Sequence, residues 1–132
     1  MNGSDGGRRR PARRDRRAAQ IHGLRAETLA VWRLRLAGYR VLARNFRVPS
    51  GEIDLIVRRG DVVAFVEVKA RTTYEGAAEA IQPYQQLRIR NAALAFLARR
   101  PDLAGLSLRF DVVLVTPWRL PRHLRDAWRD SG

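Results

Sequence analysis

The chain has 132 residues, a net charge of +13 and no cysteine. This length suits one domain with its own core, and the missing cysteines exclude disulfides and thiolate metal sites. No apolar run approaches the roughly 20 residues that cross a bilayer, and no apolar segment follows the Arg-rich N-terminus as in a secretory signal. We expect a cytoplasmic protein without membrane contact whose partner is a polyanion such as nucleic acid.

Residues 1–18 hold seven arginines, three glycines and, after Met1, no large apolar side chain. Such a segment cannot bury enough apolar surface to offset the entropy lost on ordering it. We predict a disordered basic tail over residues 1–18 and a folded domain over residues 19–132. Two roles for the tail stay open: a non-specific phosphate-binding arm, or a solvated extension.

Apolar spacing and turn residues predict seven elements beyond the tail. Gly38 suits the position just after a helix end, and Pro83 suits a first helical turn. The order α-β-β-β-α-β-α predicts an α/β fold with a mixed sheet and helices on its faces. In chain order the elements are a helix at 21–37, strands at 39–46, 52–58 and 62–70, a helix from 83 to about 99, a strand at 106–115 and a short helix at about 121–129.

The strands at 52–58 and 62–70 are predicted to form a hairpin whose two-residue loop is Arg59-Gly60. Alternate side chains along each strand point to opposite faces. In that register Asp54 lies opposite Phe65 and diagonal to Glu67, at roughly 7–8 Å. The predicted core face holds Ile53, Leu55, Val57, Ala64, Val66 and Val68, and the other face holds Glu52, Asp54, Phe65, Glu67 and Lys69.

The second face gathers two carboxylates, Asp54 and Glu67, and the chain's single lysine, Lys69, among 25 arginines. Two neighbouring carboxylates repel each other unless a cation lies between them. Mg²⁺ or Mn²⁺ suits such a pair, and a water on that metal beside Lys69 would attack a phosphodiester. Lysine is a compact charge whose pKa shifts readily, whereas arginine stays protonated. The alternative is an exposed strand on which Glu-x-Lys is a solvated alternation.

Glu27 interrupts the apolar stripe of the first predicted helix, where it shares a face with Ala30 and Leu34. A carboxylate on an apolar stripe is costly unless it is paired or binds a metal. Two interpretations stay open. Glu27 completes or orients the metal site, or it lies at the edge of the stripe and pairs with Arg25 or Arg33.

The chain resembles the uncharacterised bacterial YraN-like family through the run GYRVLARNFRVPSGEIDLIVRRGDVVAFVEVKAR. That family belongs to the restriction-endonuclease-like superfamily, which has a PD-(D/E)xK nuclease core and is linked to archaeal Holliday-junction resolvases. The resemblance covers roughly residues 20–130. It implies a restriction-endonuclease-like fold and divalent-metal cleavage of phosphodiesters, with DNA favoured over RNA. The family's helix glutamate falls on Glu27, its Gly-Glu-Ile-Asp on 51–54, and its Glu-x-Lys on Glu67 and Lys69.

The family often carries a lysine at the start of the second helix, and this chain has Gln85 there. The role of Gln85 is open between positioning the metal's water and contacting DNA. Arg71 directly follows the motif and would bind the scissile phosphate through its fork of donors, with a plain surface arginine as the alternative. Arg88 and Arg90 are expected on the exposed side of the second helix, where they would follow the nucleic-acid backbone.

Several other residues are expected to be structural. The carboxylate of Asp111, inside the last long strand, would orient an arginine and not act in catalysis. His123 is expected to be solvated. The aromatic residues expected to pack in the fold and not to stack on bases are Trp32, Tyr39, Trp118 and Trp128.

These features lead to one main hypothesis, a metal-dependent endonuclease acting on branched or otherwise structured DNA in the manner of a Holliday-junction resolvase. Asp54 and Glu67 would hold the Mg²⁺ or Mn²⁺, with Glu27 completing or orienting the shell and Lys69 positioning or activating the water. A homodimer would suit a two-fold DNA junction. Two alternatives stay open: a non-catalytic nucleic-acid-binding module on a nuclease fold, which would deliver a helicase or another partner, and an RNA-processing nuclease.

Overall fold

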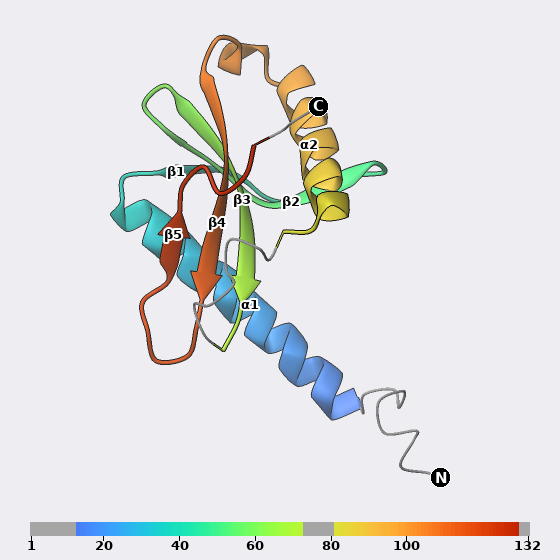
Figure 1. Ribbon diagram of the computed structural model, residues 1–132, viewed down its shortest axis with the longest axis vertical. Helices are drawn as coiled ribbons and strands as arrows, with labels where there is room; N and C mark the ends of the chain where they lie inside the picture. Colours follow the sequence, from blue (N-terminus) through green and yellow to red (C-terminus); the bar gives the residue numbers. More distant parts are fainter. Residues whose placement is uncertain (1–12, 73–80, 130–132) are drawn as a thin grey trace.

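The computed structural model describes residues 13–72 and 81–129, with the side chains of the first helix described from Arg25 onward. No helix in this described part is long and apolar enough to cross a membrane. The elements in Figure 1 are α1 (Arg13–Leu36), β1 (Arg40–Val48), β2 (Gly51–Arg59), β3 (Val62–Ala70), α2 (Pro83–Ala98), the 3₁₀ helix η3 (Pro101–Leu103), β4 (Ser107–Val115) and β5 (Arg122–Leu124).

The start of α1 corrects the predicted boundary of the tail. The helix begins at Arg13 and not at residue 21, so residues 13–18 belong to α1. The rest of the predicted tail, residues 1–12, lies outside the described residues.

The five strands form one mixed sheet in the order β1-β2-β3-β4-β5. All neighbouring pairs are antiparallel except β3 and β4, which are parallel. The parallel pair needs a crossover connection, and α2 supplies it. The predicted α/β class, a mixed sheet flanked by helices, is confirmed.

The last predicted element is wrong: residues 121–129 form no helix. The short strand β5 pairs with β4, from Val112 opposite Leu124 to Leu114 opposite Arg122. Asp126 then turns the chain with a positive φ of 53°. The predicted helix rested on only two apolar residues one turn apart. A helix this short has little stability by itself. The open edge of β4 offers backbone hydrogen bonds that outweigh this weak helical preference.

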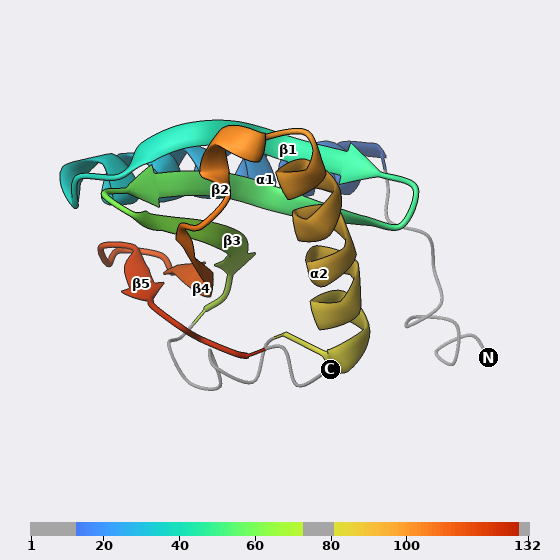
Figure 2. The ribbon, with the colours of Figure 1, turned by 90° about the horizontal axis from the view of Figure 1, so that it is seen from above.

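The sheet is buried on both faces by the flanking helices, whereas the alternation in the hairpin predicted one core face and one polar face. α1 packs through Ala30 and Leu34 on a cluster that contains Leu55, Val57 and Val66. α2 packs on the other face, where its buried side chains form a second cluster with those of β2 and β3. The members of this cluster include Ile53, Ile56, Phe65, Ile89, Ala93 and Phe96. Figure 2 shows α2 in front of the sheet with α1 behind it. Phe65, predicted on the polar face, is therefore part of a second core and is 1% exposed.

The register of the β2–β3 hairpin also differs from the prediction. Arg59 pairs with Val62, so the two-residue loop is Gly60-Asp61, with Gly60 at a φ of 60°. Positive φ suits glycine in such a hairpin loop. Phe65 consequently lies opposite Ile56 and not opposite Asp54. The shift moves the partners by two positions, so the side chains of β3 stay on the faces that were predicted for them.

A glycine at the start of β2 lets α2 lie close to the sheet. A Cβ atom at Gly51 would lie 1.8 Å from the carbonyl oxygen of Arg88, so no larger residue fits without moving the helix. Arg88 also forms an ion pair with Glu52 (2.8 Å), and Asn91 donates to the Ser50 carbonyl (3.3 Å). These contacts hold α2 across the β1–β2 turn and position Gln85 in its first turn over β3.

Candidate active site

The candidate site lies where β2 and β3 part. Their ladder runs from Arg59 and Val62 to Leu55 and Val66. Beyond this point the β1–β2 hairpin continues under α2 while β3 turns away, as Figure 2 shows. The Oδ2 atom of Asp54 reaches into the gap and accepts a hydrogen bond from the Val68 N–H at 2.8 Å. The strands thus open into a fork, and an Asp54 oxygen satisfies a backbone donor of β3.

Asp54 and Glu67 come together at this fork. The Glu67 side chain is 15% exposed. Burial and the nearby Asp54 carboxylate raise the pKa of Glu67 to about 8, and a hydrogen bond with Asp54 acts in the same direction. Lys69 lowers this pKa without cancelling the rise. At neutral pH Glu67 therefore keeps its proton, because burial and the neighbouring carboxylate both disfavour its ionised form.

Lys69 lies beside the carboxylate pair and is nearly enclosed. Its side chain is 12% exposed, and its Nζ is 3.9 Å from Glu67 Oε1. Lys69 also donates a long hydrogen bond to Gln85 Oε1 at 3.4 Å. The same Gln85 oxygen accepts from the Gln82 N–H at 3.5 Å, which ties the lysine to the start of α2. The structure thus brings together Asp54, Glu67, Lys69 and Gln85.

Glu27 is placed next to the fork but not in a three-carboxylate set. Its Oε1 accepts hydrogen bonds from Asn45 Nδ2 (3.1 Å) and Arg44 Nε (3.3 Å). In the described part of the chain, no group of three or more acidic, histidine or cysteine side chains is arranged to hold a metal. The partners of Glu27 are on β1, so the alternative pairing with Arg25 or Arg33 is wrong, whereas its role at a metal stays a prediction.

Asn45 is the site residue that sequence reasoning missed. Its neighbours Arg44 and Phe46 pair with Leu55 and Ile53, so Asn45 lies beside Asp54 in the sheet. It has a positive φ of 51° and links Glu27 to this position. An asparagine within a predicted strand was the available signal, because strands are depleted in asparagine and positive φ favours it.

The three arginines predicted to bind nucleic acid differ in exposure and in the contacts they make. Arg71 is exposed, donates to the Ala70 carbonyl (2.9 Å), and borders a cavity of about 510 Å³ that Arg25 also lines. Arg88 is engaged by Glu52, and its guanidinium lies 5.9 Å from the centre of the Tyr84 ring. Arg90 lies in the same helix and has an interaction of its own.

A second polar cluster, built around Asp111, lies away from the fork. Asp111 is fully buried and receives two bonds from Arg109 (2.8 and 2.7 Å) and one from the Asp126 N–H (2.9 Å). His123 Nε2 lies 2.7 Å from Asp111 Oδ2. Burial alone raises the pKa of Asp111, but the bonds from His123, Arg109 and Asp126 together hold it below its usual value.

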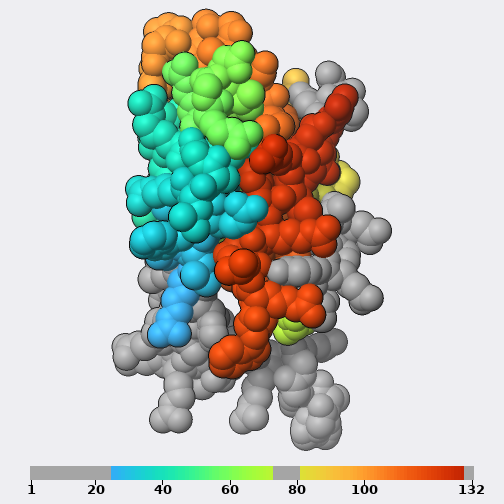
Figure 3. All heavy atoms as spheres, turned by 90° about the vertical axis from the view of Figure 1, so that its left-hand side faces the viewer, coloured from blue at the N-terminus to red at the C-terminus, as the bar shows by residue number. Residues whose placement is uncertain are grey.

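This cluster confirms the prediction that Asp111 orients an arginine. The prediction that His123 is solvated is wrong, because its side chain is only 2% exposed. Arg109 also donates to the Tyr39 hydroxyl at 2.6 Å, and the His123 ring meets the Tyr39 ring edge-on at 5.5 Å. The cluster therefore ties β4 and β5 to the start of β1. Figure 3 shows this face, with the red β4–β5 region against the cyan β1 region.

The raised pKa of Glu67 predicts a pH dependence of folding stability. Between pH 4.5 and about 8 the folded protein keeps a proton that the unfolded chain releases, so this group's contribution to stability falls as pH rises through that window. Glu67→Gln should remove the fall and stabilise the metal-free protein at pH 8 by roughly 1–3 kcal/mol. Thermal unfolding in EDTA between pH 5 and 9 measures both effects.

Asp102→Asn is the control for this measurement. A hydrogen bond from Arg100 lowers the pKa of Asp102, so this carboxylate is ionised through the whole window. Its removal should leave the shape of the pH profile unchanged. Parallel profiles for Glu67→Gln and the parent protein would contradict the proton assigned to Glu67.

Comparisons with known proteins find one family whose members are similar to most of this chain. The family model described as "Uncharacterised protein family UPF0102" matches residues 26–115. A UPF0102 protein of Paramagnetospirillum magneticum is 55% identical over 123 residues, which cover 90% of this chain and 95% of that protein. A UPF0102 protein of Parvibaculum lavamentivorans is 62% identical over 112 residues, covering 85% and 84%. One from Bartonella bacilliformis is 47% identical over 113 residues, covering 86% and 93%.

Proposed function

The chain belongs to the UPF0102, or YraN, family within the restriction-endonuclease-like superfamily, and we propose that it is a metal-dependent endonuclease acting on branched or otherwise structured DNA. The observation that supports this most is the pairing of Asp54 and Glu67 at the strand fork, with the enclosed Lys69 at 3.9 Å from Glu67. Membership of the superfamily favours phosphodiester hydrolysis, and the net charge of +13 favours a polyanionic substrate.

The residues at the fork fit Mg²⁺ or Mn²⁺. Asp54 and Glu67 offer hard carboxylate oxygens, and the raised pKa of Glu67 indicates a pair that a cation would stabilise in its ionised form. Mg²⁺ is usually held by one or two carboxylates, with waters and substrate phosphate oxygens completing its shell. When bound, such a metal supplies Lewis acidity, which lowers the pKa of water and offsets charge developing on the phosphoryl group.

The chain's own residues would divide the remaining work. The Val68 N–H holds one Asp54 oxygen in place and so directs this carboxylate. The ammonium group of Lys69 would orient the attacking water and stabilise negative charge on the phosphate, while Gln85 Oε1 holds the ammonium on the side of α2. Asn45 and Arg44 keep the Glu27 carboxylate close to the fork, where it would adjust the electrostatics of the site.

Arginines around the fork would bind the DNA backbone. Arg71 follows the motif and has its guanidinium exposed, so it would contact the phosphate next to the cleaved bond. Arg88 would exchange Glu52 for a phosphate, and Arg90 would add a contact further along α2. Two copies of the chain would match the two-fold symmetry of a four-way junction.

Cleavage of labelled DNA tests the proposed function. Four-way junctions, flaps, single strands and duplexes would be incubated with Mg²⁺, Mn²⁺ or EDTA, in parallel with the Asp54→Asn variant. We expect cleavage of a branched substrate that needs metal and is lost in Asp54→Asn, because the variant lacks one of the two carboxylate ligands. Cleavage that persists in EDTA, or in a purified Asp54→Asn protein, would contradict the assignment.

One observation favours a second candidate, a nucleic-acid-binding module without turnover. The described residues bring only two carboxylates together at the fork, and Glu67 holds a proton at neutral pH. Such a module would bind branched DNA or RNA and would deliver a helicase or another partner. Mn²⁺ titration followed by electron paramagnetic resonance separates the two: an active site binds Mn²⁺ in the parent and not in Asp54→Asn, whereas a module of this kind binds junctions with no metal.

A further inference from the structure

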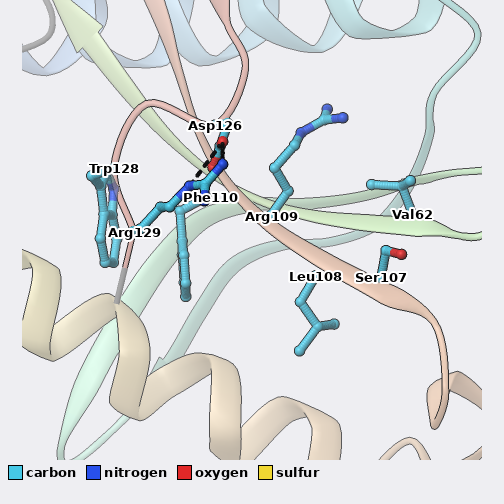
Figure 4. Close-up of a pocket in the computed structure, with 8 residues that line it drawn as sticks. All are labelled: Val62, Ser107, Leu108, Arg109, Phe110, Asp126, Trp128 and Arg129. Carbon is cyan, nitrogen blue, oxygen red and sulfur yellow. Dashed lines mark hydrogen bonds and ion pairs between the residues drawn. The ribbon is translucent and has the colours of Figure 1, made fainter. Parts of the chain in front are cut away.

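A second cavity lies along the open edge of β4. It has a volume of about 460 Å³ and is bounded by the start of β4 and by the segment after β5, including Trp128 and Arg129 (Figure 4). Among the described strands, β5 covers this side of β4 only from Val112 to Leu114. The edge of β4 beside Leu108 therefore faces the cavity and not another described strand.

Three aromatic rings lead from the candidate active site to this cavity. Phe65 precedes Glu67 by two residues and shares its face of β3, at a separation of roughly 7 Å. The Phe65 ring meets the Phe110 ring with centroids 5.7 Å apart, and Phe110 stacks on Trp128 at 4.1 Å with an interplanar angle of 19°. Trp128 ends this column and remains partly exposed. The prediction that Trp128 packs in the fold is correct, yet the ring also forms part of a cavity wall.

Polar groups next to the column can recognise a flat heterocycle. The Phe110 carbonyl accepts from the Ala127 N–H at 2.8 Å, so the backbone groups of Phe110 point toward the open edge. Because backbone direction alternates along a strand, those of Leu108 point the same way and present one donor and one acceptor to the cavity. The Arg129 side chain is 85% exposed and forms an ion pair with Asp126 at 2.9 Å, so the rim of the cavity carries a polar pair.

We infer that this cavity takes an unpaired nucleobase of the DNA strand held at the active site. The assignment rests on the proposed function, and it specifies a substrate with unstacked bases, such as a flap, a junction with frayed arms or a single strand. Stacking on aromatic side chains is the usual way in which proteins hold such bases, and it tolerates any base because each has a π face. A fully paired duplex would leave the cavity empty.

Tryptophan fluorescence tests this inference without requiring catalysis. Trp32 and Trp118 are 62% and 102% exposed, so replacing both with phenylalanine should not disturb packing and leaves Trp128 as the only tryptophan. Oligothymidylate added in EDTA should quench the emission of Trp128, because a base stacks on the ring, while a blunt duplex of equal length should quench it little. Equal quenching by both DNAs, or none by oligothymidylate, would overturn the inference.

Affinity measurements on variants of the otherwise native protein provide the second test. Trp128→Leu should weaken binding of oligothymidylate by about 5- to 100-fold, whereas Trp128→Phe should retain most of it and duplex binding should be unchanged. Trp118→Leu, a change to the fully exposed loop tryptophan, is the matched control. A Trp128→Leu protein that binds both DNAs like the parent contradicts the inference, and so does one that loses both equally while its circular dichroism stays native.

The outcomes for the cavity and for the nuclease can be told apart. Selective quenching of Trp128 with no cleavage of any substrate would support the base site and reject the proposed nuclease. Metal-dependent cleavage without selective quenching would support the proposed nuclease and reject the base site.

Discussion

Replacing Lys69 with alanine should slow DNA cleavage by about 10²- to 10⁴-fold while leaving DNA binding nearly unchanged. Lys69 is the chain's single lysine, its side chain is 12% exposed, and its ammonium lies between Glu67 and Gln85. One charge among 26 basic residues contributes little to overall attraction for DNA. Single-turnover cleavage of a labelled junction, together with a binding titration in EDTA, measures the two effects separately.

Lys69→Arg and Arg71→Ala are the matched controls for this experiment. Arginine keeps the charge but cannot fit its planar, bulkier head into the same enclosed space, so Lys69→Arg should also be strongly impaired. Arg71 is exposed and would contact phosphate, so Arg71→Ala should weaken binding more than it slows the chemical step. Lys69→Ala cleaving at the rate of the parent protein would remove Lys69 from the mechanism.

Replacing Asp111 with alanine should destabilise the protein by about 3–5 kcal/mol. The change leaves the guanidinium of Arg109 without its carboxylate, and it removes the acceptor of the Asp126 N–H and the partner of His123. A loss of this size is a large share of the 5–15 kcal/mol that holds a typical domain folded. Urea unfolding followed by circular dichroism measures the change.

Asp102→Ala is the control for Asp111→Ala because it removes a similar ion pair from the surface. Arg100 also binds Asp102 through two bonds, at 2.9 and 2.8 Å, but the Asp102 side chain is 58% exposed. Exposed pairs contribute little to stability, because water and salt screen their charges. If both variants lost the same stability, the buried Asp111 cluster would have no special role in holding β5 and the chain after it to the sheet.

Much of the fold and of the candidate site could be predicted from the sequence because the information is local. Alternating apolar residues predicted the hairpin strands, and Gly38 and Pro83 predicted a helix end and a helix start close to those observed. The even period of a strand kept Glu67 and Lys69 on one face even though the turn was placed one residue too early. The resemblance to a known family led to the same residues by an independent route.

Other features could not be predicted because they depend on partners far apart in the chain. Glu27 was assigned to the metal site from its helix position and the family resemblance, and its partners Arg44 and Asn45 come from a strand that only folding brings near. His123 looked like a solvated residue of a short helix until Asp111, 12 positions away, provided a buried partner. Ile53 was predicted to share the core face of Leu55, and it packs instead in the cluster under α2.

The sequence by itself determined the α/β class, the strands of the hairpin and the placing of Glu67 and Lys69 on one face, since side-chain periodicity and turn preference act over a few residues. Only the tertiary structure decided how those residues meet. The parting of β2 from β3 puts the Asp54 carboxylate on the Val68 N–H and next to Glu67, whose pKa rises to about 8. The close crossing of α2 over Gly51 brings Gln85 to Lys69. These are effects of burial and of distance through space, and neither is encoded in the spacing of residues along one strand.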